Sequence, residues 1–200
     1  MARVGFMGGT FDPVHVGHLA CAHVALASLE LERVLFVPAG VPSFKRDARI
    51  VSGADRLAMI ELATAGEERF VPCDIELRRE GVTYSVDTLH ELTALCPDDE
   101  FFFICGYDAL ATLPLWHRAG ELAGLATFVG IPREGCRREQ VESALLASPA
   151  AFRVAFLDMD PVDVSSTQVR ALLESGGDAS ALVPCAVLDY IEAHGLYGRG

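Results

Sequence analysis

Two glycines, a threonine and two histidines stand close together near the start of the chain, in Gly8-Gly9-Thr10-Phe11-Asp12-Pro13-Val14-His15-Val16-Gly17-His18. An apolar run at 4–7 precedes this stretch and a helical pattern follows it, which predicts a strand leading into a helix. At such a junction, backbone N–H groups and the positive end of the helix dipole face one point. His15 and His18 are three residues apart, so both can face that point from the first helical turn. The sequence therefore predicts a site for a nucleotide phosphate.

The glycines match neither the Gly-x-Gly-x-x-Gly pattern nor the Gly-x-x-x-x-Gly-Lys phosphate loop. Gly17 is expected to leave room for a ligand to approach the backbone between the imidazoles. Two other interpretations stay open. The stretch could be a turn with two solvated histidines, or a metal site, for which Asp12 is the one further ligand close in the sequence.

The composition predicts one globular domain over residues 1–200, because 51% of the residues are hydrophobic and 22% are charged. A formal net charge of −12 argues against nucleic acid or an anionic membrane as a partner. No signal peptide or membrane span is expected, which favours the cytoplasm. The six cysteines form no Cys-x-x-Cys pair and are expected to be reduced, mostly buried thiols.

Strand patterns alternate with helical ones along the chain. Strands are predicted at 4–7, 33–37, 70–77, 101–105, 126–131 and 153–157, and helices at 19–29, 52–65, 86–95, 139–146, 166–174 and 184–194. Residues 38–46 are predicted to form a loop. The expected fold is α/β, with a Rossmann-like, doubly wound, mainly parallel sheet flanked by helices.

A second polar group stands near the end of the chain, in Val164-Ser165-Ser166-Thr167-Gln168-Val169-Arg170. Ser165 or Ser166 can cap the following helix. Arg170 would then lie in the first turn, where a cation opposes the helix dipole unless an anion is bound there. An anion clamp and an ordinary cap with a surface arginine are equally compatible with this segment.

Further candidates lie between these two stretches. Lys45, in the predicted loop, could neutralise phosphate or be a solvated charge. Gly106 and Asp108 follow a buried strand at the edge where open α/β sheets bind ligands, although Asp108 could also cap a helix. Trp116 could stack on a heterocycle or pack in the core. Thr83-Tyr84-Ser85 could hold a carboxylate or form a turn before a helix.

Together these segments resemble the bacterial nicotinate-nucleotide adenylyltransferases over nearly the whole chain. The first stretch is similar to the nucleotidyltransferase motif, and Ser165-Ser166-Thr167 with Arg170 is similar to its C-terminal partner. The segment Asp74-Ile75-Glu76-Leu77-Arg78-Arg79, with Thr83-Tyr84-Ser85 and Trp116, resembles the nicotinate branch. The family usually has Pro-Pro-His-Lys where this chain has Pro42-Ser43-Phe44-Lys45, and an asparagine at Gly40.

The resemblance implies that ATP and nicotinate mononucleotide give nicotinate adenine dinucleotide and pyrophosphate, with Mg²⁺ carried by ATP and no protein ligand expected for it. The implied catalytic residues are His15, His18, Lys45 and Arg170. The implied ATP-binding residues are these two histidines and Arg170 with Gly8, Gly9, Thr10, Phe11, Gly106, Asp108, Ser165, Ser166 and Thr167. The implied nicotinate-nucleotide site is formed by Lys45, Thr83, Tyr84, Ser85 and Trp116.

Three alternative functions stay open. A pantetheine-phosphate or cytidylyl transferase would share the two terminal motifs, but Thr83-Tyr84-Ser85 and Trp116 weigh against both. A nucleotide-binding regulator without catalysis is disfavoured because His15, His18, Lys45 and Arg170 are all present. A zinc-binding module has the least support.

Overall fold

A computed structural model describes residues 1–42, 50–161 and 163–198. The elements in chain order are β1 (Arg3–Gly9), α1 (Val16–Ser28), β2 (Arg33–Pro38), β3 (Val41–Pro42), α2 (Gly53–Thr64), β4 (Phe70–Pro72), β5 (Val82–Thr83), α3 (Ser85–Leu95), β6 (Glu100–Gly106), α4 (Tyr107–Thr112), the 3-10 helix η1 (Leu113–Leu115), α5 (Ala119–Leu125), β7 (Thr127–Ile131), α6 (Arg138–Leu146), β8 (Arg153–Phe156), α7 (Ser166–Glu174) and α8 (Cys185–Ala193). Six strands form one sheet in the order β4-β2-β1-β6-β7-β8, with every neighbouring pair parallel. The predicted Rossmann-like α/β fold is confirmed.

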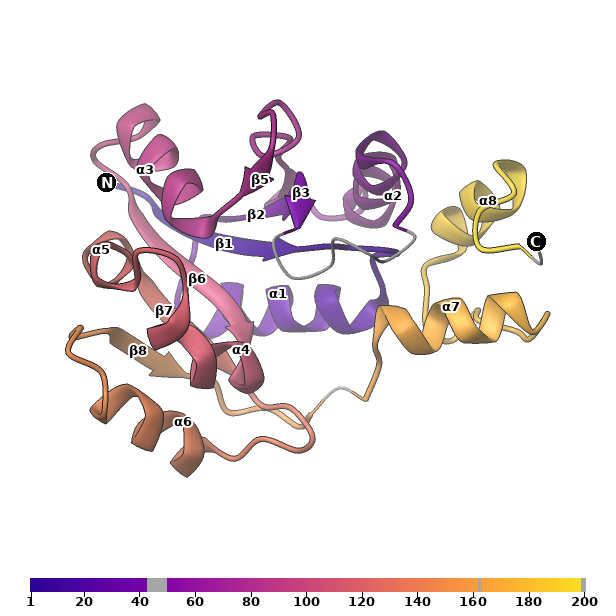
Figure 1. The fold of residues 1–200 in the computed structure, drawn as a ribbon. Coiled ribbons are helices and arrows are strands. Elements are labelled where there is room, and N and C mark those ends of the chain that lie inside the picture. The colour runs from indigo at the N-terminus through magenta and orange to yellow at the C-terminus, as the bar shows by residue number, and fades with distance from the viewer. Residues whose placement is uncertain (43–49, 162, 199–200) are drawn as a thin grey trace.

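The sheet is covered by helices on both faces, so the residues of a central strand alternate between two apolar cores. In β6, Phe102 and Ile104 belong to the core built with α1, α2, α7 and α8. Phe101 and Phe103 belong to the core built with α3, α4, α5 and α6. Figure 1 shows α1 and α3 on opposite sides of the sheet. The continuous apolar run of β6 is therefore explained by burial on both faces.

The side of the sheet on which successive strands are added changes at β1. From β1 the chain adds β2 and then β4 on one side, and afterwards crosses over to add β6, β7 and β8 on the other. In such open sheets, ligands bind in the crevice outside the carboxyl ends of the strands at this switch point. Here those ends are Gly8 and Gly9 of β1 and Cys105 and Gly106 of β6.

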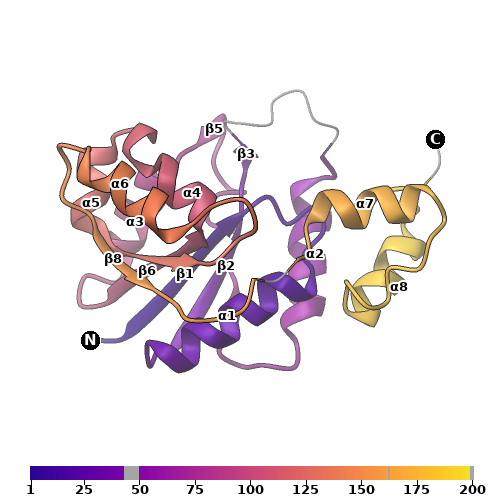
Figure 2. The same ribbon diagram turned by 90° about the horizontal axis from the view of Figure 1, so that it is seen from below.

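The end of the chain returns to this edge of the sheet. Helix α8 lies beside α2 in both views of the molecule and packs against it, and α7 precedes α8 at this end of the molecule (Figures 1 and 2). Within the described ranges, no helix is long and apolar enough to cross a membrane.

Several predicted boundaries are wrong. The extended segment at 70–77 ends at Pro72, because the chain then turns and the Leu77 N–H bonds to the Asp74 carbonyl. Strand β3 occupies two residues of the predicted loop and pairs with β5. Helices α4 and α5 were not predicted, since six or seven residues are too few to show a helical period.

The cysteines are less buried than expected. All six lie in the described ranges and are free thiols. Cys185 is exposed and the other five are half-buried. The prediction that several thiols are buried is therefore wrong, because these five cysteines pack only partly against the two cores.

Candidate active site

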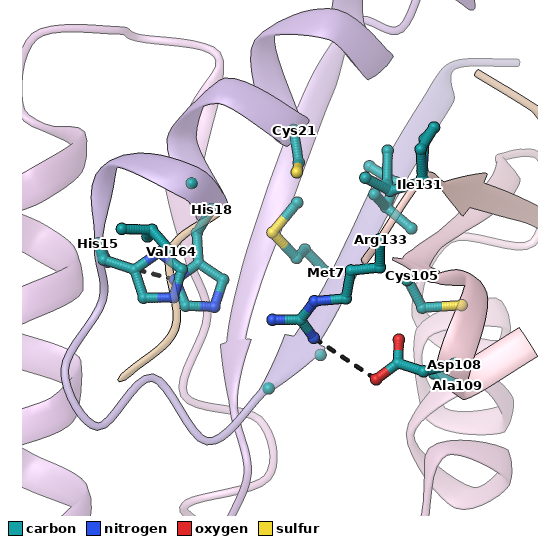
Figure 3. Close-up of a pocket in the computed structure, with 16 residues that line it drawn as sticks. Met7, His15, His18, Cys21, Cys105, Asp108, Ala109, Ile131, Arg133 and Val164 are labelled. Carbon is teal, nitrogen blue, oxygen red and sulfur yellow. Dashed lines mark hydrogen bonds and ion pairs between the residues drawn. The ribbon is translucent and has the colours of Figure 1, made fainter. Parts of the chain in front are cut away.

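A cavity of about 240 Å³ lies at the switch point, over the carboxyl ends of β1, β6 and β7. Its wall contains Gly8 and Gly9 from β1 and Gly106 from β6. The side chains that line it, several of which Figure 3 labels, include His15, His18, Asp108, Arg133 and Val164. Residues from both the first and the last part of the chain therefore meet at one cavity.

The two histidines form a stacked pair beside this cavity, at the start of α1. Their ring centroids are 3.7 Å apart, and His15 is only 3% exposed. The backbone N–H of His15 donates to Nδ1 of His18 at 3.2 Å, so in its neutral form His18 carries its proton on Nε2. Among the described residues, His15 Nδ1 has no hydrogen-bond partner. The interpretation as two solvated histidines is thus wrong.

Both imidazoles are neutral at pH 7. Burial, the neighbouring His15 and Arg133 together hold the pKa of His18 well below its usual value. Burial, with a smaller effect of Arg133, lowers the pKa of His15 from 6.5 to about 4. Neutral His18 still has one N–H donor, on Nε2, so it can hydrogen-bond to an anion without gaining a second proton.

Gly17 lines the cavity, but no space lies between the two imidazoles, because the rings stack on each other. His15 precedes the helix in an extended conformation, with φ −143° and ψ 169°. A Cβ on Gly17 would lie 3.0 Å from His15 Nδ1 and 3.1 Å from a methyl carbon of Val164. Gly17 is therefore required for close packing of the histidine and of the C-terminal segment.

The serine-rich segment joins the first stretch through several hydrogen bonds. Ser165 caps α7, since its hydroxyl accepts from the Gln168 N–H at 3.2 Å. The Ser166 hydroxyl donates to the Pro13 carbonyl at 2.9 Å. The two motifs, which are about 150 residues apart in the sequence, are thus held together at the cavity.

Arg170 is bound to the protein itself. It is the fifth residue of α7, one residue beyond the first turn in which it was expected. Its guanidinium donates to the Asp12 carbonyl at 2.5 Å and to the Thr167 hydroxyl at 3.3 Å, and lies 3.5 Å from the Asp12 carboxylate. Arg170 and the three residues 165–167 are not among the described residues that line the cavity.

Asp12 and Arg56 are buried groups that fix the loop after β1. The Asp12 carboxylate accepts from the Tyr197 hydroxyl at 2.6 Å and from the Val51 N–H at 3.4 Å. The Arg56 guanidinium donates to the carbonyls of Thr10, at 2.9 Å, and of Val51, at 3.2 Å. Within the described ranges, no group of three or more histidine, cysteine, aspartate or glutamate side chains could hold a metal ion.

Phe11 packs against the histidine pair. It is 2% exposed, has a positive φ of 51°, and packs against His18 with ring centroids 4.8 Å apart. Phe36 supports it from β2 at 5.9 Å. Phe11 therefore supports the His18 imidazole. It is not among the described residues that line the cavity.

A second cavity, of about 530 Å³, adjoins the first one. Gly8, Gly9 and Cys105 line both. The second cavity brings together Thr83, Tyr84, Ser85 and Trp116 from the predicted pyridine-nucleotide site, and adds Thr10, Glu76 and His117. The two predicted substrate sites are therefore neighbours that share a glycine wall.

Aromatic rings form much of this second cavity. Tyr84 and His117 have ring centroids 4.2 Å apart, and Trp116 is half-buried with its edge against Phe103. The Thr83 hydroxyl is buried and, among the described residues, has no partner. Flat rings and an unpartnered hydroxyl suit a heteroaromatic ring that carries a polar substituent.

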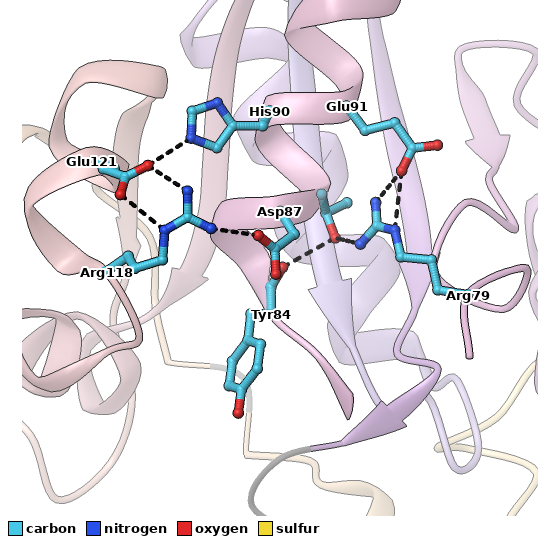
Figure 4. Close-up of polar contacts among 8 residues, drawn as sticks. Arg79, Tyr84, Asp87, His90, Glu91, Arg118 and Glu121 are labelled. Carbon is cyan, nitrogen blue, oxygen red and sulfur yellow. Dashed lines mark hydrogen bonds and ion pairs between the residues drawn. The ribbon is translucent and has the colours of Figure 1, made fainter. Parts of the chain in front are cut away.

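A network of charged side chains holds the turn that carries Trp116 and His117. Arg118 has a left-handed backbone, with φ 54°, and its guanidinium donates to Asp87 at 2.7 Å and to Glu121 at 2.8 Å. His90 adds a 3.0 Å contact to Glu121, so that α3 and α5 are tied together (Figure 4). These contacts fix the aromatic wall of the second cavity from outside.

Gly40, at the position of the family's asparagine, lies against Glu76 and Thr83, two residues that line this cavity. A Cβ added to it would be 2.5 Å from the Glu76 carbonyl oxygen and 2.8 Å from a methyl carbon of Thr83. The backbone of this protein therefore leaves no room for a side chain at Gly40. Lys45 and the rest of the segment 43–49 lie outside the described residues.

Arg133 and Arg56 were not identified from the sequence. Arg133 follows a predicted strand at the edge where Asp108 was sought, so the same rule could have found it. Arg56 stands inside an ordinary helical pattern, and no signal in the sequence marks it.

Comparisons with known proteins agree with this geometry. A family model described as Cytidylyltransferase-like matches residues 6–172. A protein of Dehalococcoides mccartyi named "Probable nicotinate-nucleotide adenylyltransferase" is 42% identical over 199 residues, which cover 98% of each chain. A Synechococcus protein with the same name is 43% identical over 195 residues, covering 98% of this chain and 94% of the relative.

Solved structures share the fold. The nicotinic acid mononucleotide adenylyltransferase of Plasmodium falciparum complexed with NaAD has a TM-score of 0.82 at 20% identity and covers 98% of each chain. The same protein complexed with APC has a TM-score of 0.80 at 19% identity, with the same coverage. Given the two cavities and the near full-length relatives above 40% identity, the chain belongs to the nicotinate-nucleotide adenylyltransferase family of cytidylyltransferase-like nucleotidyltransferases.

Proposed function

We propose that this protein transfers the AMP moiety of ATP to nicotinate mononucleotide. A phosphate oxygen of the mononucleotide attacks the α-phosphorus of ATP, the bond from that phosphorus to the bridging oxygen breaks, and pyrophosphate leaves. Nicotinate adenine dinucleotide is the other product. The observation that carries the proposal is the pair of cavities that meet at Gly8 and Gly9, one beside two imidazoles and one with aromatic walls.

The attacking group needs no strong base, because the second pKa of a phosphate monoester is about 6. Acceleration comes from holding two anions together and from stabilising charge as pyrophosphate departs. His18 acts through its Nε2–H on the α-phosphate, and its tautomer is fixed by the hydrogen bond from the His15 backbone. Lys45 adds positive charge from the segment 43–49.

The remaining residues bind the substrates. The β- and γ-phosphates are held by the backbone of Gly9 and Thr10 and by Ser166, Thr167 and Arg170. Arg170 donates to them through the guanidinium N–H groups that are not bonded to Asp12 or Thr167. Gly106 and Asp108 contact the adenosine. Trp116 stacks on the pyridine ring, and Thr83, Tyr84 and Ser85 receive its carboxylate.

Mg²⁺ enters with ATP and, when bound, neutralises charge on the phosphates. The most buried carboxylate near the site, Asp12, is already bonded to Tyr197 and paired with Arg170, which fits an ion held mainly by the substrate. We also propose a cytoplasmic location, supported by six free thiols. The net charge of −12 argues against nucleic acid as a partner.

The proposal is tested by incubating the protein with ATP and, separately, nicotinate mononucleotide and its amide. Dinucleotide and pyrophosphate are measured together. We expect both products in equal amounts with nicotinate mononucleotide. Binding of ATP without release of pyrophosphate would instead indicate a nucleotide-binding regulator.

A further inference from the structure

Arg133 is, among the described residues that line the 240 Å³ cavity, the one with a permanently cationic side chain. It follows β7, and its Cδ packs close over Gly106, where an added Cβ would lie 3.1 Å from it. Nη1 of its guanidinium is 3.5 Å from the Asp108 carboxylate. Figure 3 shows the guanidinium between the histidine pair and Asp108.

The two histidines cannot supply this charge in the free protein, because both are neutral at pH 7. They offer N–H donors, but a triphosphate carries several negative charges that neutral donors only partly balance. A guanidinium is planar and can donate two parallel hydrogen bonds to phosphate oxygens. Arg133 has this group at the cavity, beside the proposed position of the α-phosphate.

Arg133 can change partners more easily than Arg170. The Asp12 side chain is 3% exposed, so withdrawing Arg170 would leave a buried carboxylate without its paired guanidinium. The Asp108 side chain is 57% exposed and that of Arg133 is 45% exposed. A pair at this exposure contributes little to stability, and water can solvate Asp108 once the pair opens.

We propose that Arg133 binds the polyphosphate of the nucleoside triphosphate and exchanges Asp108 for phosphate oxygens when ATP enters. The inference rests on the proposed function, because it assigns a further residue to the ATP site. It makes Arg133 a direct binding residue. The alternative is that Arg133 only orients Asp108 toward the ribose.

The test uses ligands that separate the polyphosphate from the nucleoside. Binding of inorganic tripolyphosphate and of adenosine is measured by calorimetry on the full chain and on Arg133→Gln. Arg137→Gln is the matched control, since it removes one charge from an exposed residue that is not among the described residues lining the cavity. We expect Arg133→Gln to weaken tripolyphosphate binding by about 10-fold or more and adenosine binding much less. The control should bind both as the unchanged protein does.

A second variant tests the exchange itself. Asp108→Asn removes the competing carboxylate, so tripolyphosphate, which has no ribose, should bind more tightly than to the unchanged protein. Equal losses of adenosine and tripolyphosphate binding in Arg133→Gln, or unchanged or weaker tripolyphosphate binding in Asp108→Asn, would overturn the inference. These measurements need no turnover, so the dinucleotide assay still judges the proposed function by itself.

Discussion

The hydroxyl of Tyr197 donates a 2.6 Å hydrogen bond to the Asp12 carboxylate, across 185 residues of sequence. Asp12 is 2% exposed and is also paired with Arg170. Burial, followed by the contact with Asp12, raises the pKa of Tyr197 above its usual range, so the hydroxyl remains a donor. Tyr197, which follows α8, therefore holds the loop after β1 in place.

Removing this donor should destabilise the protein. Tyr197→Phe is expected to lower the free energy of unfolding by about 1–3 kcal/mol, the range for a hydrogen bond to a charged, buried group. Urea unfolding at pH 7 measures this loss. Tyr190→Phe, which removes a hydroxyl bonded to the half-buried Asp55, is the matched control and should cost less. Equal losses of unfolding free energy in the two variants would show that the Asp12 contact stabilises the protein no more than the Asp55 contact does.

Loss of the His18 imidazole should impair chemistry rather than folding. His18→Ala is expected to lower kcat by roughly 100-fold or more, as for other removed donors that act on transition-state charge. Steady-state kinetics with ATP and nicotinate mononucleotide measure the change, and thermal unfolding checks that the variant is folded. Near-normal turnover in a folded variant would contradict the role assigned to His18.

The histidine pair should make stability depend on pH. Burial lowers the pKa of His15 from 6.5 to about 4. Between these values the unfolded chain binds a proton that the folded protein excludes, so stability falls as the pH falls through this window. For His15 the full effect is about 3 kcal/mol, and His18 acts in the same direction.

His15→Gln isolates this effect, because it keeps a polar side chain but removes the titration. The free energy of unfolding should depend less steeply on pH between 6.5 and 4 in the variant than in the unchanged protein. Urea unfolding at several pH values gives the two slopes. Parallel slopes would show that the folded protein does not exclude the proton from His15.

The Thr83 hydroxyl offers a test of carboxylate recognition. It is buried and, within the described ranges, unpartnered, so Thr83→Val should leave the free energy of unfolding nearly unchanged or raise it slightly. If the hydroxyl bonds the pyridine carboxylate, the variant should lose kcat/KM for nicotinate mononucleotide. The unchanged protein should prefer the acid over its amide, and the variant should prefer it less. Unchanged preference would exclude this hydroxyl from the recognition.

The sequence predicted those parts of the first cavity that depend on local sequence pattern. Gly8 and Gly9 end a strand, and the histidines follow at helical spacing, so local pattern was sufficient. The residues suggested separate roles for Thr83 and Trp116, but only the resemblance grouped them in one site, because they come from separate segments that the fold brings together. Short paired strands such as β3 and β5 have no periodicity to detect.

Contacts over long separations escaped prediction for a physical reason. Arg56 serves as a support because it reaches the Thr10 carbonyl across 46 residues, and its own helix shows nothing unusual. The resemblance implied that Arg170 binds ATP, yet its nearest partner is the Asp12 carbonyl, and the Asp12 carboxylate lies 3.5 Å away. Which charges pair inside a site depends on the tertiary structure.

The glycine wall between the two cavities also limits how this protein can change. A Cβ on Gly8 would lie 3.2 Å from the Phe6 ring, and a Cβ on Gly9 would lie 3.2 Å from the Phe11 ring. A side chain at either position would therefore press on a core aromatic residue. An inhibitor that spans both cavities across this wall would contact backbone at which any added side chain crowds a core aromatic ring, so resistance mutations there would carry a packing cost.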